Sequence, residues 1–159
     1  MERLFRPWRM SYVEGPKDEQ GCFLCDDAVS DDERGRHILA RSAHGIVVLN
    51  RYPYNGGHLM VAPLRHVAEP ADLSPAERGE VMDLLGQCVE ALKAEFKPAG
   101  FNLGANLGRV AGAGLPGHFH LHVVPRWEGD TNFMPILGEV KVIPEALEAT
   151  YDRLRPRFD

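Results

Sequence analysis

The 159-residue sequence has only 3 cysteines, an odd number that cannot all pair in intramolecular disulfides. This cysteine usage is typical of a reducing compartment, and we expect a cytoplasmic protein. No apolar run approaches the roughly 18 residues of a membrane-spanning helix. Residues 1–15 contain basic side chains but no apolar stretch of the kind that a secretion signal requires. We therefore expect no membrane association.

An excess of positive charge is missing too, because 18 Lys and Arg face 23 Asp and Glu, a net charge of -5. Broad nucleic-acid binding depends on clustered positive charge, so we expect no nucleic-acid partner, although a small phosphorylated ligand needs only a local site. Internal repeats and low-complexity segments are not visible. The length fits a single domain, residues 1–159, in which residues 1–20 form an N-terminal arm.

The apolar and turn patterns predict an α+β domain. Ser74 as N-cap, Pro75 at the first helical position and Glu77 two residues later mark the start of a long helix that ends before Pro98. A polar segment, 26–36, is expected to form an exposed loop or a short helix, and a C-terminal helix is expected at 144–156. The order of strands and helices indicates an antiparallel sheet. We expect strands at 46–49, 58–62, 101–108 and 118–124.

The most informative segment contains three alternating histidines, His118, His120 and His122. Alternate side chains of a strand share a face, so these imidazoles are expected to point the same way, which is not a packing pattern. Two chemistries are open: the middle imidazole attacks a phosphorus atom, or two or three imidazoles bind a catalytic metal. Gly112 and Gly114 precede the strand and allow backbone N–H groups to approach an oxyanion, which favours phosphate chemistry.

The segment HFHLHVV at 118–124 resembles the signature of the histidine triad (HIT) superfamily of nucleotide hydrolases and transferases. NRYPYNGGHLMVAP at 50–63 is similar to the nucleotide-binding hairpin of that family. PRWEGDTNFMP at 125–135, with PWRMSY near the N-terminus, resembles the branch of diadenosine tetraphosphate phosphorylases and hydrolases. The resemblance implies a HIT-like fold with about five antiparallel strands, one long helix and a C-terminal helix, and it implies a homodimer.

The resemblance also implies residue roles. His120 would attack the α-phosphorus and form a covalent nucleotidyl-histidine, while His122 would contact the α-phosphate and the leaving group. Many family members place Ser, Thr or Gln shortly before the triad, whereas this chain has Gly114-Leu-Pro116, which leaves the choice between water and orthophosphate as second acceptor open. The expected nucleotide-binding residues are Asn50 at the ribose, His58 beside the triad, Asn106 at the phosphates, and Gly112 and Gly114.

Cys22 and Cys25 form a C-x-x-C motif, which is either a redox pair or half of a zinc site. The redox interpretation needs an adjoining βαβ pattern, and none is evident. Zinc-containing HIT proteins resemble this chain in using two cysteines, a histidine after the second strand and the first triad histidine, which here are His66 and His118. Four protein ligands would fill the tetrahedral coordination of the zinc ion, so this zinc would be structural and would withdraw His118 from catalysis.

The sequence therefore predicts a hydrolase or phosphorylase that acts on a small nucleotide substrate, a dinucleoside polyphosphate such as diadenosine tetraphosphate, with structural zinc and no organic cofactor. Two alternatives stay open, a nucleotide-binding protein with little turnover and a metal-dependent hydrolase that uses the triad as ligands. The sequence does not decide whether Arg109, Arg126 or Trp127 contacts the ligand.

Overall fold

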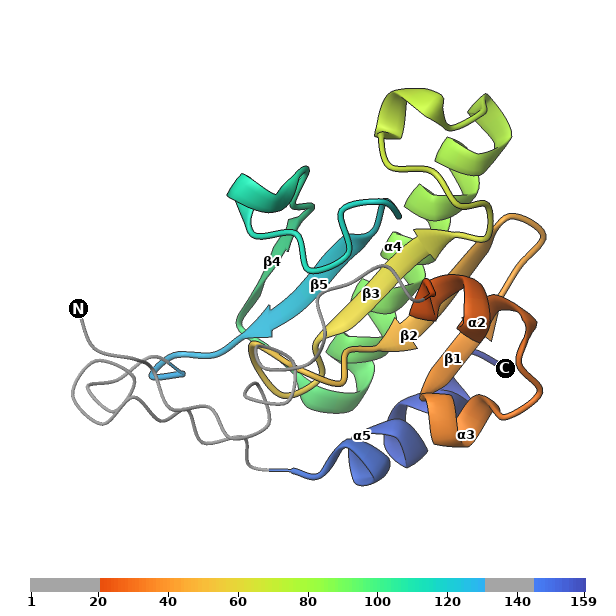
Figure 1. Cartoon of the computed structure of the whole chain (residues 1–159). Helices are drawn as coiled ribbons and strands as arrows, with labels where there is room; N and C mark the ends of the chain where they lie inside the picture. Colours follow the sequence, from red (N-terminus) through yellow and green to blue (C-terminus); the bar gives the residue numbers. More distant parts are fainter. Residues whose placement is uncertain (1–20, 131–144) are drawn as a thin grey trace.

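The computed structural model describes residues 21–130 and 145–159, so the predicted N-terminal arm at 1–20 lies outside the described residues. Five strands form one antiparallel sheet in the order β1-β2-β3-β5-β4 (Figure 1). Within the described ranges, no helix combines the length and apolarity needed to cross a membrane. The strands are β1 (Ile38–Arg41), β2 (Gly45–Leu49), β3 (Leu59–Pro63), β4 (Gly100–Gly104) and β5 (Leu121–Arg126).

The helices are α2 (Phe23–Val29), α3 (Glu33–Arg36), α4 (Pro75–Phe96) and α5 (Leu147–Leu154). The long helix α4 begins as predicted with a capping box, because the Ser74 hydroxyl accepts from the N–H of Glu77 and the Glu77 carboxylate accepts from the N–H of Ser74. It ends at Lys97, which adopts a left-handed φ of 48° directly before Pro98. The predicted C-terminal helix is present but shorter than 144–156.

The central strands β2 and β3 are buried on both faces. Because side chains alternate along a strand, one set packs against α4 and the other against α2. Figure 1 shows α4 behind the sheet and α2 in front of it. The α4 side is formed from the sheet by Val47, Leu49, Leu59, Val61 and Val123. The α2 side is formed by Ile46, Val48, Met60 and Ala62 around Leu24 of the helix.

The strand predicted at 118–124 is displaced along the chain, since β5 begins at Leu121 and includes Pro125. Its neighbour β3 ends at Pro63, which has no N–H to continue the ladder, and the N–H of Phe119 donates instead to the carbonyl of Val67. His118 and His120 therefore precede the strand. The strand predicted at 101–108 stops at Gly104, which lies opposite His122, because the segment before β5 diverges from it there.

β1 was not predicted, and it pairs with β2 through a register irregularity between Ile38 and Ala40. Residues 26–36, expected as an exposed loop or a short helix, belong mostly to the short helices α2 and α3, but Asp27 is only 1% exposed. The side chain of Arg41 ties these segments together by donating to the backbone carbonyls of Asp27 and Ser30.

Candidate active site

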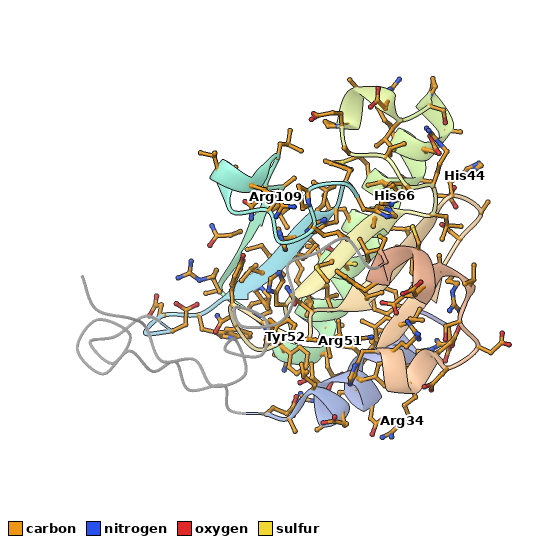
Figure 2. All side chains as sticks on the ribbon, viewed as in Figure 1. Arg34, His44, Arg51, Tyr52, His66 and Arg109 are labelled. Atoms are coloured by element: carbon orange, nitrogen blue, oxygen red, sulfur yellow. The ribbon has the colours of Figure 1, made fainter. Side chains whose placement is uncertain are left out.

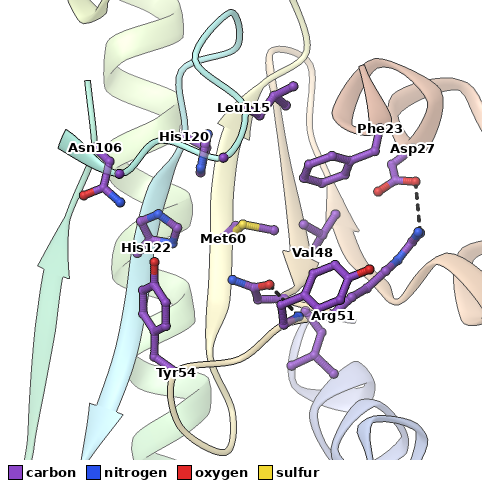
Figure 3. A pocket seen from close by; sticks show the side chains of 15 residues that line it. Phe23, Asp27, Val48, Arg51, Tyr54, Met60, Asn106, Leu115, His120 and His122 are labelled. Atoms are coloured by element: carbon purple, nitrogen blue, oxygen red, sulfur yellow. Dashed lines mark hydrogen bonds and ion pairs between the residues drawn. The ribbon is translucent and has the colours of Figure 1, made fainter. Parts of the chain in front are cut away.

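A row of side chains crosses the α2 face of the sheet. Val48 of β2 lies opposite Met60 of β3, and Met60 lies opposite His122 of β5. Above this row is a cavity of about 320 Å³, walled by α2, by the turn after β2 and by the loop before β5 (Figure 3). Six of the predicted catalytic and nucleotide-binding residues line the cavity, namely Asn50, Asn106, Gly112, Gly114, His120 and His122.

His120 is held in one tautomer by the backbone. Its Nδ1 lies 2.8 Å from the carbonyl oxygen of His118. A carbonyl can only accept, so Nδ1 carries the hydrogen and Nε2 keeps the lone pair. Figure 3 shows the His120 ring pointing into the cavity beside His122, and the two ring centroids are 4.9 Å apart. The arrangement presents a neutral imidazole nitrogen that can act as a nucleophile.

His122 is oriented by a chain of hydrogen bonds that runs through His58. The N–H of Tyr54 donates to Nδ1 of His58 over 3.0 Å, so His58 carries its hydrogen on Nε2. That nitrogen lies 3.0 Å from Nδ1 of His122 and donates to it. His122 must then carry its own hydrogen on Nε2. The chain of bonds leaves an N–H donor of His122 for a group in the cavity.

Burial lowers the pKa of His122 to about 4, and the electrostatic interaction with the adjacent His120 ring adds to the effect. His122 is therefore neutral near pH 7 and works as a hydrogen-bond donor rather than as a cation. His58, which the resemblance groups with the nucleotide-binding residues, is fully buried and does not line the cavity. It contacts His122 and Asn50 instead, with 3.3 Å between the Asn50 amide nitrogen and His58 Nδ1.

The loop before β5 forms one wall of the cavity but does not offer all the backbone donors expected of it. Gly112 adopts a left-handed φ of 88°, and its N–H donates to the carbonyl of Arg109 over 3.0 Å. This N–H is therefore engaged within the turn. Gly112 lines the cavity, where its lack of a side chain shapes the wall, but its own N–H does not point to a ligand in this arrangement.

The three residues that the sequence left undecided lie away from the cavity lining. Arg109 sits on the turn that follows β4 (Figure 2). The guanidinium of Arg126 donates to Asp130 and Asn102. The indole N–H of Trp127 donates to the carbonyl of Phe96 over 3.4 Å.

A second cluster lies where α2 begins. The four predicted metal ligands, Cys22, Cys25, His66 and His118, place one donor atom each within 4.8 Å of one another. Nδ1 of His118 is 3.1 Å from the sulfur of Cys22 and 3.5 Å from that of Cys25, which is 3.4 Å from Nδ1 of His66. Tetrahedral zinc with its usual bond lengths separates sulfur and nitrogen ligands by about 3.5 Å. The spacing fits zinc.

The donor chemistry of this cluster also fits a metal. Nε2 of His118 donates to the carbonyl of Pro63 over 2.8 Å, which leaves the lone pair of Nδ1 facing the sulfurs. Burial and the neighbouring Cys22 raise the pKa of the Cys25 thiol to about 11, so a cation is needed to hold Cys25 as a thiolate. Gly117 makes room for His66, because a Cβ there would lie 3.3 Å from the ring.

Phe23, Asp27, Arg51 and Tyr54 are among the residues of the cavity wall that were not predicted from the sequence. Phe23 and Asp27 are four residues apart on α2 and so share one helix face. Phe23 lies within the C-x-x-C motif and Asp27 two residues after it, but no signal in the sequence indicated that these two side chains face the cavity.

The comparisons with known proteins agree with this geometry. The family model described as HIT domain matches residues 32–129. The chain is 42% identical over 158 residues to the AP-4-A phosphorylase of Mycobacterium tuberculosis, which covers 94% of this chain and 80% of that protein. It is 28% identical over 96 residues to the asymmetrical bis(5'-nucleosyl)-tetraphosphatase of Schizosaccharomyces pombe, covering 60% of this chain and 52% of that protein.

Solved structures share the fold. A Zn-bound histidine triad family protein from Mycobacterium smegmatis matches with a TM-score of 0.69 and 22% identity over 86% of this chain and 92% of that chain. A histidine triad nucleotide-binding protein from Sulfolobus tokodaii matches with a TM-score of 0.66 and 23% identity over 86% of this chain and 91% of that chain. These likenesses establish the five-stranded α+β architecture that the sequence predicted.

Proposed function

Since the chain belongs to the HIT family, we propose that it is an enzyme that cleaves dinucleoside polyphosphates, with diadenosine tetraphosphate as its substrate, through a covalent nucleotidyl-histidine on His120. The observation that carries the proposal is the orientation of the two cavity histidines. His120 turns a lone pair and His122 an N–H group toward the same space, 4.9 Å apart between ring centroids. The named relatives, a phosphorylase and a tetraphosphatase, support the substrate class.

In the first step, Nε2 of His120 attacks the α-phosphorus. A nitrogen–phosphorus bond forms, the bond from phosphorus to the bridging oxygen breaks, and the leaving nucleotide departs as an anion. The N–H of His122 donates to the oxygen on which charge develops, and the backbone carbonyl of His118 stabilises the charge on the His120 ring. Asn50 and Asn106 line the same cavity and supply polar contacts for the ribose and the phosphates.

In the second step, an acceptor attacks the same phosphorus and releases His120. Orthophosphate as acceptor converts the adenylyl group to ADP, while water converts it to AMP. Splitting the reaction in two is favourable because a neutral imidazole is a better nucleophile than water. The 42% identity to a phosphorylase supports orthophosphate as the acceptor.

We propose zinc for the cluster of Cys22, Cys25, His66 and His118. With four protein ligands the ion has no open position for substrate, so its role is structural. It would fix the start of α2 and the His118 backbone, whose carbonyl orients His120. The alternative in which the triad itself binds a catalytic metal is disfavoured, because His118 turns to the cysteines while Nδ1 of His122 is occupied by His58.

A homodimer is proposed from the edge of the sheet. β4 is an edge strand, and the chain at and after it exposes Leu103 by 50%, Leu107 by 44% and Val110 by 106%. An open strand edge flanked by apolar side chains is a template for pairing with a second chain. A second copy of this protein, related by a two-fold axis, would cover this edge on both partners.

The decisive experiment is product analysis with diadenosine tetraphosphate, with and without orthophosphate, on the wild type and on His120→Gly. We expect ADP and ATP only when orthophosphate is supplied, and no turnover by the variant. His44→Ala is the matched control, because His44 is an exposed histidine on the turn between β1 and β2. Undiminished turnover by His120→Gly would remove the proposed nucleophile.

A radiolabelled substrate separates the enzyme from a binding protein. Wild-type protein denatured at alkaline pH should retain the label on the chain and should release it in acid, since the first step leaves an acid-labile nitrogen–phosphorus bond to His120. A protein that binds the nucleotide tightly but never retains the label would be a nucleotide-binding protein with little turnover.

A further inference from the structure

The cavity has two chemically different ends. His120, His122 and Asn106 gather at one end, and the pair of Asp27 and Arg51 closes the other (Figure 3). Apolar side chains lie between them, supplied by Phe23, Val48, Met60 and Leu115. A nucleotide whose phosphate reaches His120 must extend its base along the apolar part. The edge of the base then meets the charged pair.

Asp27 has more charged neighbours than are needed to neutralise its buried carboxylate. Its side chain is only 2% exposed, and Arg36 already neutralises it through a 2.8 Å contact to Oδ1. Arg51 approaches the same oxygen from 3.6 Å, and its own side chain is 43% exposed. Within residues 21–130 and 145–159, none of the ion pairs or hydrogen bonds of this carboxylate involves Oδ2. A hydrogen-bond acceptor and a mobile donor therefore stand side by side in the cavity wall.

We propose that Asp27 and Arg51 read the edge of an adenine ring and make this enzyme selective for 6-aminopurine nucleotides. The inference rests on the proposed function, since it takes the base that sits in the cavity to belong to the nucleotide that reacts with His120. The carboxylate of Asp27 accepts from the 6-amino group, and the guanidinium of Arg51 donates to the ring nitrogen beside it.

The pattern of donors favours adenine over other purines. The 6-amino group of adenine is a donor with an acceptor nitrogen on either side, so an acceptor and a donor in the wall match it with the ring in either orientation. In the same pose, a 6-oxo purine presents an acceptor to the carboxylate, which repels it, and its protonated N1 to the guanidinium. Inosine and guanine rings can match the pair along one edge only, by shifting so that N1–H meets Asp27 and O6 meets Arg51.

The test is equilibrium binding of mononucleotides to the wild-type protein by calorimetry, which does not depend on turnover. The series is AMP, inosine monophosphate, GMP and purine riboside monophosphate, which lacks any group at position 6. We expect AMP to bind at least about tenfold more tightly than the other three. Equal affinities would overturn the inference and leave the proposed function standing, whereas failure of every nucleotide to bind would overturn both.

Variants locate the selectivity. Asp27→Asn replaces an acceptor by a group that also donates, so the preference for AMP over inosine monophosphate should fall to about unity or reverse. Asp26→Asn is the matched control, because Asp26 is an exposed neighbour on the same helix. Arg51→Gln tests the donor on a half-exposed side chain that tolerates change, and it should reduce AMP affinity several-fold. An unchanged preference in Arg51→Gln and Asp27→Asn would contradict the assignment.

Discussion

Replacing His58 by phenylalanine tests the chain of hydrogen bonds that orients His122. His58 is fully buried and accepts from the N–H of Tyr54 while donating to Nδ1 of His122. Phenylalanine has a similar volume but neither group. The substitution therefore leaves a buried N–H and a buried ring nitrogen without partners and removes what fixes the tautomer of His122.

Two effects of different kind should follow. Each unsatisfied buried group costs about 1–3 kcal/mol, so the free energy of unfolding should fall by roughly 2–6 kcal/mol. Once the tautomer is free, His122 can present a lone pair rather than an N–H to the reacting phosphate. Removal of one hydrogen-bond donor to a developing oxyanion typically costs about 10²–10³ in kcat. The assay is urea denaturation together with steady-state turnover of diadenosine tetraphosphate.

The conservative variant separates orientation from packing. In His58→Gln, the amide oxygen can accept from Tyr54 and the amide nitrogen can donate to His122, which keeps the order of donor and acceptor. We expect turnover in this variant to exceed that of His58→Phe by at least about tenfold, even where the two unfold at similar urea concentrations. A folded His58→Phe protein with wild-type kcat would refute the argument.

Three other predictions follow from the site and the sheet edge. The pKa of His122 is lowered to about 4 from 6.5, so between these pH values the unfolded chain binds a proton that the folded protein does not. The free energy of unfolding should therefore be at its full value above pH 6.5 and should decline by at most about 3 kcal/mol toward pH 4. Urea titrations should find this loss reduced in His122→Asn. His66→Ala removes an exposed member of the Cys/His cluster, so the proposed zinc, measured by atomic absorption, should be lost, with a lower kcat because the backbone of His118 is released; full zinc retention would exclude His66 as a ligand. Leu103→Lys should convert the proposed dimer to a monomer in light scattering, while Met82→Lys, on the exposed face of α4, should not.

The elements that the sequence predicted best are those with local signals. The capping residues Ser74 and Glu77 and the stop at Pro98 bound α4 because their hydrogen bonds form within the helix itself. β1 and the true limits of β5 depend on distant partners instead. β5 begins at Leu121, where its pairing with Val61 of β3 begins, and no pattern within 118–124 indicates where that pairing stops.

For the site, too, residues with a local sequence signal were predicted and residues that depend on distant partners were not. Among the residues that line the cavity, His120 was predicted from the alternation of histidines, whereas Asn106 was expected only from the resemblance to the HIT family. Alternation alone predicted three imidazoles on one face, whereas His118 faces the cysteines and only His120 and His122 face the cavity. Asp27 appeared to be a member of a solvated acidic run, because burial of a carboxylate depends on Arg36 and Arg51 folding onto it.

The two clusters of the site are joined through one residue, His118. Its ring takes part in the Cys/His cluster through Nδ1 and is fixed by Pro63 through Nε2, while its backbone carbonyl accepts the Nδ1 hydrogen of His120. A ring held at both nitrogens cannot rotate, and the carbonyl of the same residue is held with it. The tautomer of the proposed nucleophile is thus set by a group that the chain fixes for structural reasons. A metal in the Cys/His cluster would therefore control reactivity at His120 without touching substrate.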